Sequence, residues 1–343
     1  MNTDRILEYQ LTCIGGLEDV AVDELQAALA GRIHSLRIER GEVGRLYFRT
    51  EASPKRLLEL GCPTAIEAVA AQAHDVTVGQ PGLQRVLRCL GGLPTESARR
   101  LAGACDAGVD LSRVELHVTI NGAHRFGTSD VEAGAGEILR EAGFQTYRPA
   151  DRPAGGLRPL RLTIRIRRKR VLVTMQLGAR RPVGDPEREG WPGPAENAVR
   201  RLLDLDGDLP VAGSPAPGVL RSTQSQATRI QGLTFATPAM TVPARLSALA
   251  AHLPMATGAL PVLLLVPHLD SAAVAQQLQE AVRVVTPGGV LGLLVRRSEV
   301  LVALLRRLGL PLEVMATVPF YLRRRRCALF LFERLELLGI ESA

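Results

Sequence analysis

The chain has a long stretch without acidic residues. Residues 209–269 contain no Asp and no Glu, although about six would be expected at the overall frequency of acids. An open α/β sheet that binds a nucleotide-like cofactor usually supplies one acidic side chain to the ribose hydroxyls. A carboxylate of that kind is therefore excluded from this stretch.

Cysteines are few and scattered, and long apolar runs are missing. The five cysteines are Cys13, Cys62, Cys89, Cys105 and Cys327. They show no Cys-x-x-Cys or His–Cys spacing, which argues against a disulfide framework and a zinc site. The longest apolar run, 259–267, is too short to span a bilayer, and no charged-then-apolar leader opens the chain. We expect a cytoplasmic protein without a membrane segment or a metal.

Lysine and aromatic residues are scarce, whereas arginine is abundant. Lysine occurs only at Lys55 and Lys169, and aromatics make up 3% of the 343 residues. Hydrophobic residues make up 46%, which is ample for two or three folded domains. The net charge of +7 indicates a polyanionic partner, and Arg side chains bind phosphates in bidentate fashion. A genome-wide codon bias would also replace Lys by Arg, but it would not cluster the arginines.

Apolar periodicity predicts alternating strands and helices in the first half. Expected strands are 9–14, 43–50 and 113–120, and expected helices are 17–29, 54–60, 84–90 and 97–107. Ser129-Asp-Val-Glu132 is typical of a capping box that begins another helix. Residues 160–167 alternate apolar with polar side chains, Arg168-Lys169 form a turn, and 171–177 return, so we expect a β-hairpin.

The second half has the rhythm of an open α/β sheet. Residues 184–194 are rich in Gly, Pro and charge, as expected of a linker. Helices are then expected at 197–205, 271–285 and 298–308, and strands at 263–266, 290–295, 312–318 and 327–335. The continuous apolar run 263–266 is typical of a buried parallel strand. The fold class is α/β, and this part predicts the second half of a doubly wound sheet that closes with a hairpin.

Three stretches resemble the THUMP-domain RNA methyltransferases, which act on guanine N2 of tRNA or large-subunit rRNA. They are the opening 9–25 with Thr12-Cys-Ile-Gly-Gly-Leu-Glu18, the central 113–138 with Asn121-Gly-Ala-His-Arg-Phe126, and Val284-Val-Thr-Pro-Gly-Gly289 before a strand. Ala179-Arg-Arg-Pro182 stands where the family has a basic exit segment. The resemblance implies a ferredoxin-like N-terminal domain (1–78), a THUMP RNA-binding domain (79–183), a linker (184–194) and a Rossmann-like class I methyltransferase-type domain (195–336).

The chain departs from this family at three points that carry chemistry. The cofactor turn within 208–218 keeps Gly213, Ser214 and Gly218 but contains three prolines, which remove N–H donors. Residues 235–240, where the family has the acid that binds the ribose, contain no acid. The loop expected to hold the target base reads Val266-Pro-His-Leu-Asp270 and lacks the amide and the aromatic of the family. We therefore predict no catalytic residue and no bound S-adenosylmethionine. If a cofactor does bind, Gly213, Ser214 and Gly218 are the residues expected to contact it. The alternative for these three residues is a plain loop without a ligand.

Two further residues in the last of these loops have simpler interpretations. His268 is a lone histidine at a strand end, and a histidine in that position more often has a structural role than the role of a general base. Asp270 is expected to be the N-cap of the helix that follows.

Candidate RNA contacts are basic residues near the hairpin and the central loop. They are His124, Arg125, Arg161, Arg165, Arg167, Arg168, Lys169, Arg170, Arg180 and Arg181. The alternative for the hairpin is a solvated strand face that resists edge aggregation, and for His124-Arg125 an ordinary polar turn. A second basic run, 323–326, is interpreted as a solvated hairpin turn, with a contact to RNA as the less favoured alternative.

These features favour one hypothesis over two others. The favoured one is a binder of structured RNA, expected to be tRNA and, by the resemblance, its acceptor end, with a degenerate third domain. The first alternative is an active S-adenosylmethionine-dependent tRNA or rRNA methyltransferase with unconventional cofactor contacts. The second is a non-catalytic subunit of an RNA-modification complex, with a protein partner that binds an apolar patch.

Overall fold

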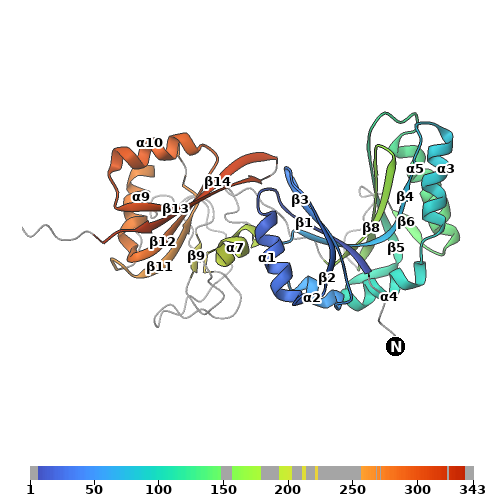
Figure 1. The fold of residues 1–343 in the computed structure, drawn as a ribbon, viewed down its shortest axis with the longest axis horizontal. Coiled ribbons are helices and arrows are strands. Elements are labelled where there is room, and N and C mark those ends of the chain that lie inside the picture. Colours follow the sequence, from blue (N-terminus) through green and yellow to red (C-terminus); the bar gives the residue numbers. More distant parts are fainter. Residues whose placement is uncertain are drawn as a thin grey trace, which may run out of the picture. The chain divides into compact units, whose positions relative to one another are not determined.

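A computed structural model describes residues 7–147, 157–178, 193–202, 211–213, 221–222, 256–267, 269–270, 272–322 and 324–336 (Figure 1). The chain forms two compact units. Unit 1 consists of Met1–Cys13, Val22–Glu39 and Arg45–Arg181, and unit 2 of Ile14–Ala21, Arg40–Gly44 and Pro182–Ala343. No helix among the described residues is long and apolar enough to cross a membrane.

Unit 1 is built on one eight-stranded sheet with the order β2-β3-β1-β4-β8-β7-β5-β6. The strands are β1 (Leu7–Ile14), β2 (Ile33–Glu39), β3 (Val43–Thr50), β4 (Ala65–His74), β5 (Val109–Asn121), β6 (Gln145–Tyr147), β7 (Arg158–Arg167) and β8 (Arg170–Leu177). Antiparallel pairing of β4 with β8, from Ile66 opposite Leu177 to His74 opposite Arg170, joins the two halves. The segments 1–78 and 79–183 therefore contribute strands to a single sheet.

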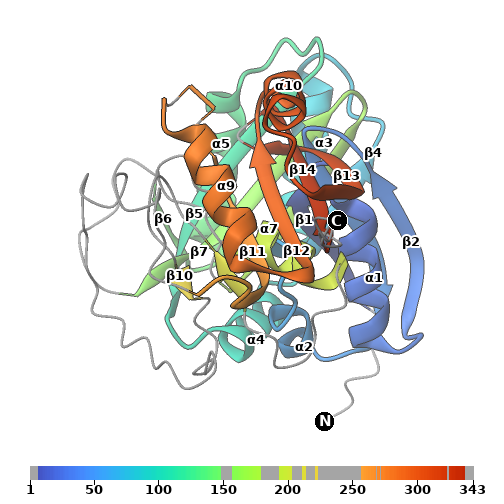
Figure 2. The same ribbon diagram turned by 90° about the vertical axis from the view of Figure 1, so that its left-hand side faces the viewer.

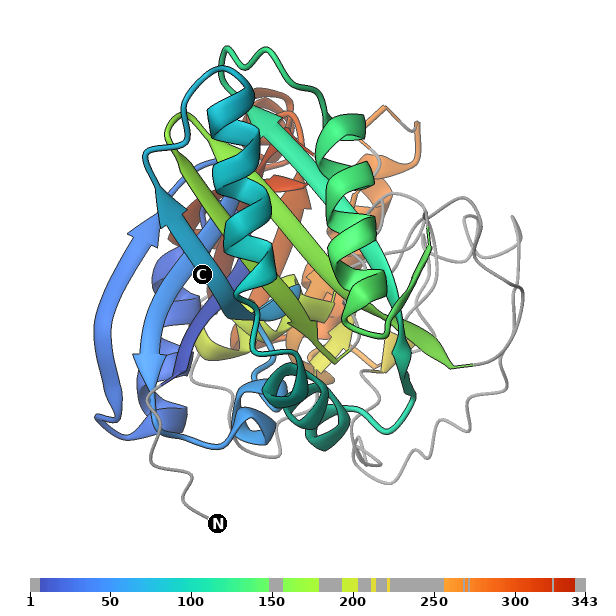
Figure 3. The same ribbon diagram turned by 90° about the vertical axis from the view of Figure 1, so that its right-hand side faces the viewer.

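Two helices lie side by side on one face of this sheet (Figure 3). They are α3 (Gln80–Gly91) and α5 (Thr128–Glu141), and the other helices of the N-terminal region are α1 (Glu18–Leu29), α2 (Pro54–Leu58) and α4 (Thr95–Cys105). Val86 and Leu90 of α3 and Val131 and Leu139 of α5 are buried. Their apolar faces explain why both helices form here, since burial of an amphipathic face stabilises a helix more than local propensity does.

The β-hairpin of β7 and β8 forms as predicted. The apolar side chains of β7 (Leu160, Leu162, Ile164 and Ile166) are all buried, because alternate residues of a strand face the same side of a sheet. The turn lies at Arg168 and Lys169, as the sequence indicated.

The start of α5 differs from the prediction. Its N-cap is Gly127, whose N–H donates to Asp130 Oδ2 at 2.7 Å, so Ser129 lies inside the helix and the predicted capping box 129–132 is wrong. The extended backbone of Gly127 places the carboxylate three residues later at the free N–H, as an N3 acid does in a capping box.

Unit 2 contains a six-stranded sheet with the order β10-β9-β11-β12-β14-β13. The strands are β9 (Val211–Gly213), β10 (Arg221–Ser222), β11 (Leu260–Leu265), β12 (Val285–Val295), β13 (Leu312–Leu322) and β14 (Arg325–Arg334). β9, β11 and β12 are parallel, and β14 runs antiparallel between β12 and β13. This is the second half of a doubly wound sheet closed by a hairpin, as expected.

The helices of unit 2 are α7 (Gly193–Leu202), α9 (Val274–Val284) and α10 (Ser298–Leu308). Leu278 of α9 and Leu301 of α10 pack with Leu291 and Leu293 in one buried cluster. Figure 2 shows these two helices together with the strands β11 and β12 of the same unit. Side chains on the other face of the sheet, such as Leu294, are buried too. Burial on both faces accounts for the continuous apolar runs of β11 and β12.

Two predictions for unit 2 are corrected by the structure. The helix α9 begins at Val274 with Ala273 as its N-cap, so Asp270 is not the cap; its carboxylate forms an ion pair with Arg297 instead. The Pro287-Gly-Gly segment does not precede the strand but lies within β12, where the pairing with β11 shifts between Leu260 and Val262. A bulge of this kind absorbs residues that would otherwise form a turn.

The two glycines of the opening motif belong to unit 2 and permit a close backbone approach there. The Tyr321 N–H donates to the Gly15 carbonyl at 2.8 Å. A Cβ on Gly16 would lie 2.3 Å from the Pro319 carbonyl oxygen, and Gly16 has φ +92°. Only glycine meets both requirements.

Candidate nucleic-acid interface

Three loops meet at one end of the unit 1 sheet. They are the turn between β7 and β8, the loop 75–79 after β4, and the loop 122–127 after β5. Val76 N–H donates to the Lys169 carbonyl at 3.0 Å, Arg168 N–H to the Asn121 carbonyl at 2.8 Å, and Arg125 N–H to the Val78 carbonyl at 2.8 Å. These bonds hold the three segments in one surface.

Strand register brings basic side chains together on this surface. Arg167 pairs with Arg170 across the hairpin, and Asn121 at the end of β5 pairs with Arg167. We name five exposed residues of this end the basic turn cluster: Arg125, Arg167, Arg168, Lys169 and Arg170. Within the described part of the chain, Arg167 alone of the five has an ion pair, with Glu39 at 3.6 Å. Four cations are thus left to interact with a polyanion.

The backbone of this end adopts unusual conformations. Asp75 has φ +62°, Arg168 has φ +55° and Gly122 has φ +140°. The left-handed conformation costs a non-glycine residue about 1–2 kcal/mol, and it persists where surrounding contacts impose it. Here the backbone hydrogen bonds between the loops impose it and fix the direction of the basic turn.

Two helices begin next to the same loops. The helix α3 follows Gly79, has no side-chain cap, and starts where loop 75–79 ends. The helix α5 follows Gly127, where loop 122–127 ends. Because a helix carries partial positive charge at its N-terminus, the start of α3, which has no acid in its first turn, adds to the positive potential of the basic turn cluster. The start of α5 does not, since the Asp130 carboxylate lies at its first N–H groups.

The two residues of the central loop have different environments. Arg125 is exposed, whereas His124 is partly buried and its ring centroid lies 4.9 Å from that of Phe126. Both ring nitrogens of His124 are buried and have no hydrogen-bond partner among the described residues. His124 therefore packs under the loop, and Arg125 is the residue of this pair that is available at the surface.

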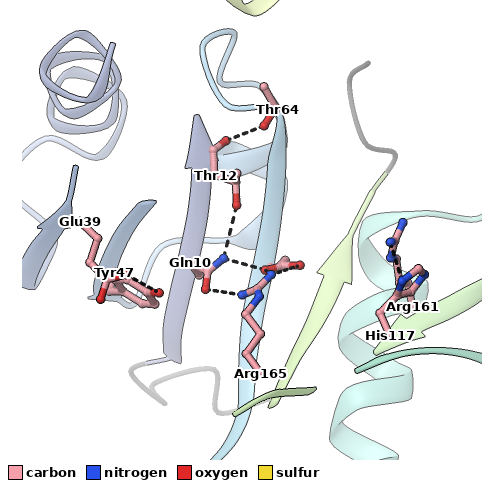
Figure 4. A network of polar contacts seen from close by, with 9 residues as sticks. Gln10, Thr12, Glu39, Tyr47, Thr64, His117, Arg161 and Arg165 are labelled. Carbon is pink, nitrogen blue, oxygen red and sulfur yellow. Dashed lines mark hydrogen bonds and ion pairs between the residues drawn. The ribbon is translucent and has the colours of Figure 1, made fainter. Parts of the chain in front are cut away.

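Arg165 belongs to a buried polar network rather than to the exposed turn (Figure 4). Its Nη1 donates to Gln10 Oε1 at 2.6 Å, and its Nη2 donates to Glu67 Oε2 at 2.7 Å. Glu67 is fully buried and also accepts from Gln10 Nε2 at 2.8 Å. The Arg165 guanidinium is thus occupied by groups of β1 and β4.

Arg161 is also engaged within the sheet (Figure 4). Its Nη2 lies 3.1 Å from His117 Nδ1, and His117 Nε2 lies 2.5 Å from Glu115 Oε1. With Nδ1 as acceptor, the ring proton is on Nε2 and is donated to Glu115. The structure thus separates Arg161 and Arg165 from the turn residues. Arg180 and Arg181 lie outside the described residues.

The carboxyl end of the unit 2 sheet is where a doubly wound fold places its ligand site. The strand β9 ends at Gly213 and pairs in parallel with β11, as expected of a strand that precedes a cofactor turn. The candidates Ser214, Gly218 and His268 lie outside the described residues. After β11, the segment 266–270 contains no Phe, Tyr or Trp, and its carboxylate, Asp270, is paired with Arg297.

The described residues after β11 therefore carry no aromatic ring that could stack on a target base. Residues 235–240, where an acid for a cofactor ribose is expected, lie outside the described residues. Within the described ranges there is also no group of three His, Cys, Asp or Glu side chains that could hold a metal ion.

Comparison with known proteins gives structural matches only. No protein family and no curated protein sequence matches significantly. The crystal structure of TrmN from Thermus thermophilus matches with a TM-score of 0.65 at 20% identity, over 96% of this chain and 100% of TrmN. SMU.472, a putative methyltransferase complexed with SAH, matches with a TM-score of 0.53 at 13% identity, over 97% and 100% of the two chains.

A third structure has the same architecture. A predicted N6-adenine-specific DNA methylase from Listeria monocytogenes matches with a TM-score of 0.53 at 14% identity, over 95% of this chain and 96% of its own. At these identities the likeness establishes the fold. The chain has an α/β fold with a ferredoxin/THUMP-like first part and a methylase-like domain, as in TrmN, which confirms the fold expected from its sequence.

Proposed function

We propose that this chain binds structured RNA, with tRNA as the first species to test, through the basic turn cluster. The observation that carries the proposal is the meeting of five exposed cations at one end of the unit 1 sheet, on the β7–β8 hairpin and the loop after β5, with only one of them ion-paired within the described residues. RNA duplexes are recognised largely by shape and by contacts to phosphates and 2′-hydroxyls, which suits a rigid basic surface.

The fold supports the proposal without fixing the activity. The chain shares its architecture with TrmN and with a putative methyltransferase over nearly its whole length. Proteins of this architecture that modify RNA must first hold a structured RNA substrate. We infer that this chain keeps the holding function in unit 1.

In this proposal unit 2 is a scaffold that has kept its packing and lost its chemistry. Both faces of its sheet are buried, as in a folded domain. The stretch 209–269 contains no acid, including at 235–240 where a ribose would be held, and the loop after β11 contains no aromatic residue for a target base. The loss of three chemical elements together, with an intact core, favours a binder over an enzyme.

One observation favours a second candidate, an active S-adenosylmethionine-dependent RNA methyltransferase. The strand β9 ends at Gly213 beside β11, which is the position of a cofactor-binding turn in a doubly wound sheet. This candidate requires that neutral groups hold the ribose.

A paired assay distinguishes the two candidates. The full-length chain is titrated with fluorescently labelled bulk tRNA over a series of salt concentrations, and in parallel it is incubated with tRNA and tritiated S-adenosylmethionine. We expect salt-dependent binding and no tritium in the RNA. Tritium transfer would establish the second candidate, and an absence of salt-dependent binding would refute RNA binding through the basic turn cluster.

A further inference from the structure

A second group of arginines lies at the carboxyl end of the unit 2 sheet. Arg296 and Arg297 follow β12, and 324–326 form the turn and the first residues of the β13–β14 hairpin. Val295 pairs with Ala328, and Tyr321 pairs with Arg326, so both groups lie on neighbouring strands about 5 Å apart. We name Arg296, Arg297, Arg324, Arg325 and Arg326 the arginine edge.

The charge of four of these five residues, Arg297 and Arg324 to Arg326, is weakly compensated within the described part of the chain. Arg324, Arg325 and Arg326 are exposed, and no carboxylate in the described part of the chain forms an ion pair with any of them. Arg297 is paired with Asp270, but 84% of the Asp270 side chain is exposed. An ion pair this exposed contributes at most about 1 kcal/mol, so a phosphate oxygen can replace Asp270 at small cost.

A helix adds to the positive potential. The helix α10 begins at Ser298, directly after Arg297, and no side chain caps its first turn. Its free N–H groups and the positive end of its dipole favour an anion at this position, and only Glu299 in that turn opposes it.

The chemistry of the arginine edge selects among ligands. S-adenosylmethionine carries a positive sulfonium, which the arginines would repel. A chain of phosphodiesters has the opposite charge and repeats it, which matches several guanidinium groups in a row.

We propose that the arginine edge binds the phosphate backbone of RNA at the carboxyl end of the unit 2 sheet. This inference rests on the proposed function, because the class of ligand is the one proposed for the basic turn cluster. Unit 2 then contributes to RNA affinity without chemistry.

The test uses two pairs of exposed arginines in unit 2. R325A/R326A removes two charges from the arginine edge, and the matched control R306A/R307A removes two charges from the last turn of α10. We expect the edge variant to lower the slope of log K against log salt for tRNA by about two and to weaken binding about tenfold. R325K/R326K should keep the slope near that of the wild type, and thermal unfolding should show that all variants fold.

Each other outcome has a definite meaning. If the basic turn cluster variant R168A/K169A/R170A loses affinity while R325A/R326A keeps the wild-type slope, the arginine edge is overturned and the proposed function stands. If R306A/R307A lowers the slope as much as R325A/R326A, the effect is one of net charge, and the inference is again overturned. If the wild type shows no salt-dependent tRNA binding, the proposed function fails and the inference fails with it.

Discussion

The Arg165 guanidinium reaches across strand β8 to the carboxylate of Glu67 on β4, at 2.7 Å. Glu67 is fully buried, and Gln10 on β1 donates to the same carboxylate. The ion pair therefore joins β7 to β4, and the hydrogen bonds of Gln10 join both to β1, so the second half of the unit 1 sheet is connected to the first. Arg165, which the sequence suggested as an RNA contact, thus has a structural role in the sheet.

Replacing Arg165 should destabilise the protein strongly. Arg165→Ala leaves the buried Glu67 carboxylate with Gln10 as its remaining side-chain partner among the described residues, and an uncompensated buried charge costs about 3–5 kcal/mol. Glu67→Gln should cost less, since it leaves no buried negative charge and Arg165 remains partly exposed. Urea unfolding of both variants and of the double variant R165M/E67L, which should recover part of the loss, gives the comparison. Equal stabilities of R165A and the wild type would show that the pair is not structural.

Two glycines of α3 should respond in opposite ways to alanine. A Cβ on Gly82 would lie 1.9 Å from the Thr77 carbonyl oxygen, whereas a Cβ on Gly91 would meet nothing within 4 Å. Gly82→Ala should therefore lower the free energy of unfolding by about 1–3 kcal/mol, and it should weaken RNA binding because it displaces loop 75–79. Gly91→Ala should raise stability by up to about 1 kcal/mol. Chemical denaturation measures both, and a harmless Gly82→Ala would contradict the close approach of α3 to its preceding loop.

We expect the protein to lose stability at alkaline pH because two tyrosine side chains, Tyr9 and Tyr47, are buried. Burial raises the pKa of Tyr9, with a smaller contribution from Cys105, and burial together with the nearby Glu39 raises the pKa of Tyr47. A phenol in the unfolded chain ionises at about pH 10. Above that pH the unfolded state loses protons that the folded state retains, so the stability that is complete below about pH 10 falls as the pH rises.

The matched variant for this prediction is Tyr9→Phe. The Tyr9 hydroxyl is buried and has no hydrogen-bond partner among the described residues, so its removal should leave stability at neutral pH unchanged or about 1 kcal/mol higher. The variant should also lose less stability than the wild type between about pH 9 and about pH 11, as unfolding in urea at each pH would show. An identical pH dependence of the two proteins would argue against a buried phenol at this position.

Local signals in the sequence predicted much of the fold. The helix α10 begins and ends where the apolar spacing and Gly309 indicated, and Gly309 has the left-handed φ of +58° typical of a helix end. The strand β2 (Ile33–Glu39) was missed, because its side chains are at most partly buried and the alternation is weak. Its formation depends on pairing with β3, which the short segment does not reveal by itself.

The candidate site was predictable only in part. The turn at Arg168 and Lys169 follows from the hairpin pattern. The alternation of apolar and polar residues along β7 did not indicate that Arg165 is engaged inside the sheet while the turn residues are exposed. The partner of Arg165, Glu67, is 98 residues away along the chain, and only the pairing of β4 with β8 brings it near. The pairing of β4 with β8 also places loop 75–79 next to the basic turn, and the sequence of the loop does not indicate this position.

The salt dependence of tRNA affinity for R168A/K169A/R170A tests the central claim most directly. The matched control is R85A/R88A/R140A, which removes three exposed arginines from α3 and α5 of the same unit. If the basic turn cluster binds phosphates, the first variant should lower the slope of log K against log salt by about two to three, and the control should keep the wild-type slope. Equal slopes for the cluster variant and the wild type would contradict RNA binding at this surface.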